Sequence, residues 1–98
     1  MSGALNEQQL AERLGLPFQE EIDDQQVHDS LLSQLPLSFV RSRCLLPLAE
    51  QDGCLILALA NPADLLSQDE VARRYGMPVR GVVVPKEELL AAINRLYS

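Results

Sequence analysis

The spacing of hydrophobic residues divides this chain into a helical first third and a later part with strand-like runs. Near the start, Leu10 and Leu14 lie four residues apart, Asn6 occupies a cap position, and Gly15 follows the last periodic residue. Leucines four apart share one helix face, and glycine tolerates the left-handed conformation that often ends a helix. The pattern predicts a helix over residues 6–15.

Two prolines bound the next elements of the pattern. Pro17 disfavours helix for the residue before it, so we expect an extended segment there. A second helix is predicted from Asp24 to Leu35, because its apolar residues fall on one stripe: Val27, Leu31, Leu32 and Leu35. Pro36 ends that helix and opens a short one over residues 37–43.

From Cys44 onward the pattern changes to short apolar runs. The runs CLLPLAE and CLILALA are joined by QDG, which predicts a β-hairpin. The second run is apolar at every position, as expected of a strand that is covered on both faces. Pro47 lacks a backbone donor, so the first strand is expected at the sheet edge or bulged at this residue.

The last third alternates between helix and strand. Ser67 and Glu70 fit a capping box, and Gly76 would end that helix. Residues 82–84 predict a third strand, and a helix over residues 86–97 follows Pro85. We therefore predict an α+β fold, with N-terminal helices beside a small mixed three-stranded sheet, built as a hairpin followed by a right-handed βαβ crossover.

Length and charge refine this organisation. The 98 residues suit one domain, which we divide into an acidic helical subregion, 1–35, and an α/β core, 36–98. The first 35 residues hold seven acids and one arginine, and so account for the whole net charge of −6. This acidity argues against nucleic acid as a partner and against unaided binding to anionic lipid. Without an apolar run of ~18 residues or a signal peptide, the chain is expected to be cytoplasmic.

The sequence offers little chemistry. His28 is the only histidine, and no G-x-x-x-x-G-K-[ST] motif is present. Cys44 is expected opposite about Leu59 and Cys54 near Ala49, too far apart for a disulfide, so both should be free thiols. We therefore expect no catalytic, metal-binding or cofactor-binding residue and no enzymatic activity in this chain.

The remaining candidates are residues for binding a protein partner. The short helix at 37–43 carries two arginines that can hold carboxylates bidentately, and the first third offers an acidic surface for a basic partner. The candidate partner-binding residues are therefore Arg41, Arg43, Glu20, Glu21, Asp23 and Asp24.

Four segments follow one another along the chain: LAERLGLPF, LPLSFVRSRCLLPLAEQDGCLILALANPADL, DEVARRYGMPV and VVPKEELLAAINRLY. In this order they resemble the N-terminal domain of the type II secretion and type IV pilus assembly ATPases, the GspE/PilB family. Each is a common pattern, but their order covers nearly the whole chain from Leu10. Besides any family role, ANPAD is expected to be a strand-to-helix turn, in which Asn61 and Asp64 bind backbone groups.

The resemblance implies a docking module rather than a motor. In that family the ATP-hydrolysing domains lie C-terminal, and the N-terminal domain ties the cytoplasmic hexamer to the inner-membrane platform. The implied partner in type II secretion is the cytoplasmic domain of a GspL-like protein. The chain would then be peripheral at the inner membrane through that partner, without inserting into it.

The resemblance also implies an alternative, which is binding of cyclic di-GMP. Some relatives use tandem R-L-G-x-x-L-(V/L)-x-x-G motifs for this nucleotide. Arg13, Leu14 and Gly15 begin such a motif here. However, Ile22 replaces the second glycine, Pro17 interrupts the segment, and there is no second copy.

Overall fold

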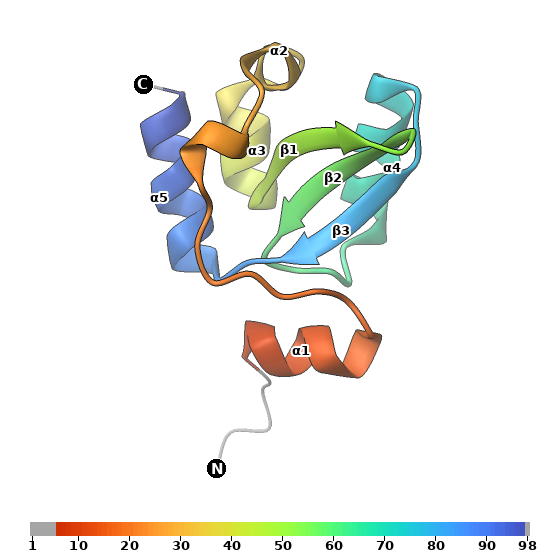
Figure 1. Ribbon diagram of the computed structural model, residues 1–98, viewed down its shortest axis with the longest axis vertical. Coiled ribbons are helices and arrows are strands. Elements are labelled where there is room, and N and C mark those ends of the chain that lie inside the picture. The colour runs from red at the N-terminus through yellow and green to blue at the C-terminus, as the bar shows by residue number, and fades with distance from the viewer. Residues whose placement is uncertain (1–5, 98) are drawn as a thin grey trace.

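Five α-helices, one short 3-10 helix and a three-stranded sheet make up residues 6–97, the part of the chain that the computed structural model describes (Figure 1). The helices are α1 (Glu7–Leu14), α2 (Asp29–Leu32), α3 (Leu37–Arg43), α4 (Leu65–Tyr75) and α5 (Lys86–Leu96), with the 3-10 helix at Asp24–Gln26. The strands are β1 (Leu45–Gln51), β2 (Cys54–Leu59) and β3 (Val79–Val83). The predicted α+β class is confirmed.

Hydrogen bonds at both ends explain why α1 has the predicted bounds. The Gln9 N–H donates to Asn6 Oδ1 at 2.8 Å, and the Asn6 N–H donates to Gln9 Oε1 at 3.1 Å. Gly15 takes a φ of 69° and its N–H bonds the Ala11 carbonyl, which closes the last turn. Ala11 is the buried residue of this helix, whereas Leu14 is 51% exposed.

The continuous helix predicted from Asp24 to Leu35 is wrong. The chain is extended at Val27 and His28, where φ is −87° and −88°, so the 3-10 helix and α2 are separate elements. The His28 N–H donates to the Leu48 carbonyl of β1 at 3.3 Å. This hydrogen bond to the sheet replaces one that a continuous helix would have made within itself.

The apolar stripe of that segment is nevertheless buried, with exposed fractions of 2–7%: Val27, Leu31, Leu32 and Leu35. Two tyrosine hydroxyls bind carbonyl groups at its end. Tyr75 Oη donates to the Leu31 carbonyl, and Tyr97 Oη donates to the Leu32 carbonyl at 3.3 Å. Each of these carbonyls also accepts a backbone N–H three residues on, from Gln34 and Leu35, so the tyrosines from α4 and the end of α5 supply second donors.

The hairpin turns at Asp52 and Gly53, whose φ values are 53° and 76°. Two consecutive positive φ values match the twist of antiparallel strands. β1 pairs antiparallel with β2, and the register shifts between Pro47 and Ala49. The strand order β1-β2-β3 leaves β1 at the edge, so the predicted edge strand with an irregularity at proline is confirmed.

The two cysteines lie at opposite ends of this hairpin. Leu59 pairs with the residue after Cys44, one position from the predicted partner. Cys54 pairs with Gln51 rather than lying near Ala49, because the turn itself takes only two residues. Both thiols are free, in agreement with the expectation from their spacing.

β3 lies beside β2 in parallel, so the predicted parallel crossover through α4 is confirmed. The strand begins earlier than the predicted residues 82–84. The segment after α1 continues the sheet: the Val83 N–H donates to the Pro17 carbonyl, and the Gln19 N–H donates to the Val83 carbonyl, both at 2.9 Å. The expected extended conformation after Pro17 is therefore confirmed.

The two faces of β2 are not equally covered. Its leucines share one face and are at most 2% exposed: Leu55, Leu57 and Leu59. On the opposite face Ala58 is buried, but Cys54 and Ile56 remain half-buried. The predicted coverage of both faces holds at the Ala58 end and fails toward the hairpin turn.

α4 begins with a different cap from the predicted one. Asp64 is the N-cap, and its Oδ1 accepts a hydrogen bond from the Ser67 N–H at 3.2 Å. Ser67 lies in the first turn of the helix, so the predicted capping box of Ser67 with Glu70 is wrong. The predicted end at Gly76, with a φ of 68°, is confirmed.

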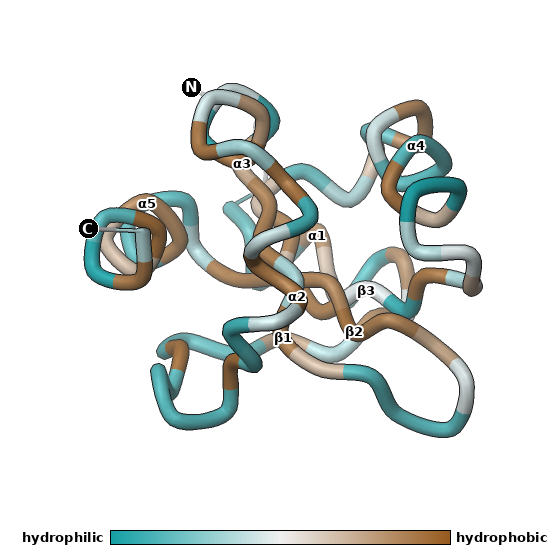
Figure 2. The backbone as a smooth tube through the Cα atoms, turned by 90° about the horizontal axis from the view of Figure 1, so that it is seen from above, coloured by the Kyte–Doolittle hydropathy of each residue, from teal (hydrophilic) through white to brown (hydrophobic). Residues whose placement is uncertain are grey.

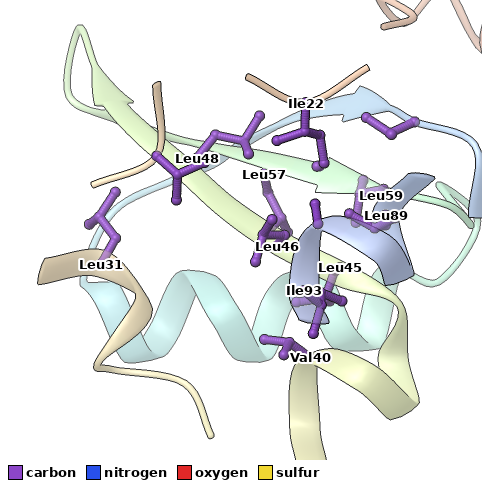
Figure 3. Packing of buried hydrophobic residues seen from close by; sticks show 14 of the residues in the cluster. Ile22, Leu31, Val40, Leu45, Leu46, Leu48, Leu57, Leu59, Leu89 and Ile93 are labelled. Atoms are coloured by element: carbon purple, nitrogen blue, oxygen red, sulfur yellow. The ribbon is translucent and has the colours of Figure 1, made fainter. Parts of the chain in front are cut away.

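The core is one hydrophobic cluster that joins α2, α3, α4, α5 and the sheet. Figure 3 shows Leu89 and Ile93 of α5 beside Leu45 and Leu46 of β1, with Val40 of α3 below them. In Figure 2, α3 and α4 lie on the same side of the sheet. Residues from both predicted subregions enter the cluster, and their division at residue 35 stays a prediction.

We expect alkaline pH to destabilise the domain through Tyr75. Burial raises the pKa of its phenol to about 12, whereas an unfolded tyrosine titrates at about 10. The stabilising contribution is complete below about pH 10 and is lost as the pH rises through about 12. Urea denaturation at about pH 8 and about pH 11 should show a fall in the free energy of unfolding.

Tyr75→Phe is the control for this prediction. The variant should be less stable near neutral pH, because the Leu31 carbonyl loses the Tyr75 hydroxyl and keeps only the Gln34 N–H as a donor. It should also lose less stability at alkaline pH than the natural chain. An equal alkaline loss in both proteins would assign the effect to another group.

Candidate functional site

Residues 6–97 contain no group of three or more His, Cys, Asp or Glu side chains that could hold a metal ion. His28 is exposed and precedes α2. Among the helices of the same range, none is long and apolar enough to cross a membrane.

A shallow hollow of about 420 Å³ lies beside the hairpin, where one sheet face is incompletely covered. It is lined by residues of the extended segment, β1 and β2: Gln19, Gln26, His28, Leu48, Ala49, Glu50, Gln51 and Ile56. Neutral amides make up much of its polar lining. Because the lining includes no Ser, Thr, Cys or Lys beside His28, the hollow offers no nucleophile–base pair.

The two arginines of α3 are exposed but contact different helices. Arg41 Nη2 donates to Asn94 Oδ1 of α5 at 3.2 Å. Arg43 Nη1 donates to Ser67 Oγ of α4 at 2.8 Å. The structure therefore does not bring Arg41 and Arg43 together, although the sequence suggested one patch. Whether either residue binds a partner stays a prediction.

Arg43 belongs to a cluster that sequence reasoning missed. Its guanidinium carbon lies 5.3 Å from the centre of the Phe39 ring, and that of Arg74 lies 5.4 Å from the same centre. A cation over an aromatic face is attracted by the ring quadrupole. We call Phe39, Arg43 and Arg74 the arginine–phenylalanine cluster; it joins α3 to α4.

Hydrogen bonds fix one side of this cluster. Ser67, which is fully buried, accepts from Arg43 and donates from Oγ to Asp64 Oδ2 at 2.6 Å. The hydrogen bonds that Ser67 donates hold the pKa of Asp64 below its usual value, and the charge of Arg43 acts in the same direction. The cap of α4 and the orientation of Arg43 are therefore linked.

The acidic candidates occupy the segment between α1 and α2. Glu20 and Glu21 are exposed, and Asp23 caps the 3-10 helix with its side chain. Asp24 is engaged within the domain, since its two oxygens accept from Arg95 at 2.9 and 3.0 Å. The structure thus places Glu20, Glu21 and Asp23 toward solvent and ties Asp24 to α5.

A second carboxylate strengthens this tie to α5. Glu88 Oε2 accepts from the Ile22 N–H at 2.8 Å and from Arg95 Nη2 at 3.5 Å. The hydrogen bond from Arg95 lowers the pKa of Asp24, although partial burial acts in the opposite direction. These contacts hold the acidic segment against α5, which gives Asp24 a structural role.

The sequence carried a signal for part of the arginine–phenylalanine cluster. Phe39 and Arg43 are four residues apart, and side chains at this spacing meet on one helix face. Arg74 is 35 positions from Phe39, and only the tertiary placement of α4 beside α3 brings their side chains together.

The ANPAD segment is a turn as predicted, since Asn61 Oδ1 accepts from the Ala63 N–H at 3.2 Å.

Fold and sequence together define the protein class. The MshEN domain family matches residues 14–98, and the chain belongs to this family. The predicted resemblance to an N-terminal domain of type II secretion and type IV pilus ATPases is confirmed by that match and by the solved structures of similar fold.

Two solved structures of the N-terminal domain of XpsE are similar to this chain. One is 33% identical with a TM-score of 0.70, covering 87% of this chain and 60% of that one. The other is 31% identical with a TM-score of 0.72, covering 91% and 62%. A structure of MshE with cdg is 27% identical with a TM-score of 0.73, covering 97% of this chain and 71% of that one.

The chain is also similar to two proteins named adsorption protein B. Bacteriophage adsorption protein B of Escherichia coli K12 is 28% identical over 102 aligned positions, which cover all of this chain. Bacteriophage N4 adsorption protein B of Escherichia coli O157:H7 gives the same identity and coverage. The chain spans 14% of the length of these curated relatives.

Proposed function

We propose that this chain is a non-catalytic docking domain of a secretion ATPase. It would link the cytoplasmic motor to the cytoplasmic domain of a GspL-like inner-membrane platform protein in type II secretion. The observation that carries the proposal is the arginine–phenylalanine cluster, because arginine and aromatic side chains are enriched in protein interfaces and dominate their affinity. The 33% identity to the XpsE domain supports this context.

The proposal extends to the protein that would contain this domain. We place ATP-hydrolysing domains C-terminal to it and count them as a second partner within the same protein. The assembly would be cytoplasmic and peripheral at the inner membrane, held there through the platform protein. This extension rests on the resemblance to the secretion ATPases.

Binding of cyclic di-GMP is the second candidate function. It is favoured by the 27% identity to MshE, which was solved with cdg, and by the partial motif at the exposed end of α1. Against it, Ile22 stands where the motif needs its second glycine and is only 6% exposed in the core. Residues after Gly15 are extended and pair with the sheet instead of continuing a helix.

Calorimetric titration of the 98-residue chain tests both functions. We expect saturable binding of a GspL-like cytoplasmic domain and no binding of cyclic di-GMP under the same conditions. Binding of cyclic di-GMP alone would overturn docking in favour of the nucleotide.

Two variants test which charged residues bind the platform protein. Arg41→Ala/Arg43→Ala should weaken platform binding about ten-fold or more, which corresponds to losing an interface hot spot. The matched acidic variant is Glu20→Gln/Glu21→Gln/Asp23→Asn, which leaves the Asp24–Arg95 pair intact and should bind normally. Loss of binding in the acidic variant alone would assign docking to the segment before α2.

A further inference from the structure

α4 carries two parallel stripes that each consist of a leucine, an acidic residue and an arginine. Leu66, Glu70 and Arg74 are spaced i, i+4 and i+8, and so are the residues one position earlier: Leu65, Asp69 and Arg73. Residues at this spacing line one side of a helix, and a shift of one residue turns the stripe about 100° around the axis. The two stripes therefore present the same chemistry in two directions.

Only the stripe of Leu66, Glu70 and Arg74 continues onto α3. Arg74 lies over the Phe39 ring and pairs with Glu70 at 3.7 Å, so its side chain is held against the neighbouring helix. Leu66 is 81% exposed at the N-terminal end of the same stripe. In the other stripe, Asp69 and Arg73 pair with each other and are 64% and 69% exposed.

The charge of this region differs from that of the rest of the chain. α3 and α4, with the Asp64 cap, carry four arginines and three acids, a net charge of +1 in a chain of −6. Among the ion pairs between described residues, none involves Arg43, which contacts the neutral hydroxyl of Ser67 and the aromatic ring of Phe39. Arginine donors beside an aromatic ring and an exposed leucine suit a partner that supplies carboxylates next to an apolar side chain.

We propose that the Leu66–Glu70–Arg74 stripe and the arginine–phenylalanine cluster form one docking surface for an acidic amphipathic segment of a partner protein. The carboxylates of that segment would bind Arg43 and Arg74, and its large apolar residue would cover Leu66. This inference rests on the proposed docking function and specifies the surface and the chemistry of the partner.

The matched stripes provide the experiment. Binding of the GspL-like cytoplasmic domain is measured for Leu66→Ser/Arg74→Glu and for the control Leu65→Ser/Arg73→Glu, which makes the same changes one residue away. We expect the first variant to bind at least ten-fold more weakly and the control to stay within about two-fold of the natural chain. Affinity for the natural chain should fall as NaCl rises, because the arginine contacts are screened.

The outcomes separate this inference from the proposed function. Platform binding that is unchanged in the Leu66→Ser/Arg74→Glu variant would overturn the surface and leave docking intact. Equal losses of affinity in both variants would overturn the surface, because they would indicate a general electrostatic attraction to the arginines of α4. Self-association of the natural chain in sedimentation velocity, lost only in the first variant, would identify a second copy as the occupant and overturn the acidic partner.

Folding of the variants is checked independently. Both should unfold thermally at nearly the midpoint of the natural chain, since all four changed residues are surface positions. If Leu66→Ser/Arg74→Glu unfolds early, Arg74→Gln replaces it, which removes the charge without reversing it. Retained binding by a folded Arg74→Gln would contradict the role of this arginine, whereas a loss restricted to this variant and absent from Arg73→Gln would support it.

Discussion

Replacement of Leu57 by alanine is expected to lower the free energy of unfolding by about 2–5 kcal/mol. Leu57 is fully buried on the central strand, between β1 and β3, where its removal leaves a cavity that the paired backbones cannot close. A domain of this size has a total stability of about 5–15 kcal/mol, so the loss is a large part of it. Urea denaturation followed by circular dichroism measures the change.

Ile56→Ala is the matched control on the same strand. Ile56 faces the opposite side of the sheet and is half-buried, so its truncation should cost less than about 1.5 kcal/mol. A shift of one residue in strand register exchanges the two faces. Equal losses in the two variants, or a larger loss for Ile56, would therefore contradict the assigned faces of β2.

Asp64→Ala is expected to destabilise the domain by about 1–2 kcal/mol. The variant removes the N-cap of α4 and leaves the buried Ser67 hydroxyl without its acceptor. Asp69→Ala on the same helix should stay within about 0.5 kcal/mol, because it loses only an exposed ion pair with Arg73. Chemical denaturation of both variants provides the comparison, and equal effects would contradict the capping role.

The effect of Asp64 should depend on pH. Its pKa is lowered in the folded state, so its contribution is complete above the unfolded pKa of about 3.9 and is lost as the pH falls through the lower folded value. The difference between the natural chain and Asp64→Ala should therefore shrink at about pH 2. Asp64→Asn keeps a good cap residue and should retain most of the stability near neutral pH.

Much of the fold was predictable because it depends on neighbours in sequence. The cap at Asn6, the left-handed residues Gly15 and Gly76, and the turn at Gly53 are local, and their spacing predicts where elements end. The cap of α4 was misassigned because two nearby residues, Asp64 and Ser67, are both of types that suit an N-cap. The burial of Ser67 beside Arg43 is the tertiary feature that distinguishes them.

The candidate site was less predictable, because its members come from separate helices. The sequence indicated arginines on the helix at 37–43 as binding residues, but it gave no sign that Arg41 would contact α5 and Arg43 would contact α4. It also offered Asp24 as a partner-binding acid, whereas the structure pairs it with Arg95, 71 residues away. Such pairs depend on how the helices pack.

The sequence by itself determined the α+β class, the order of the elements and the family, since periodicity, caps and turns act over a few residues. The tertiary structure decided where the helix between Asp24 and Leu35 breaks. There the apolar residues are buried although the helix is broken, and hydrogen bonds with distant residues hold the broken form. The Leu48 carbonyl accepts from His28, and the Tyr75 hydroxyl, 44 positions away, binds the Leu31 carbonyl. No local pattern encodes these bonds, because their partners meet only after the sheet and helices have packed.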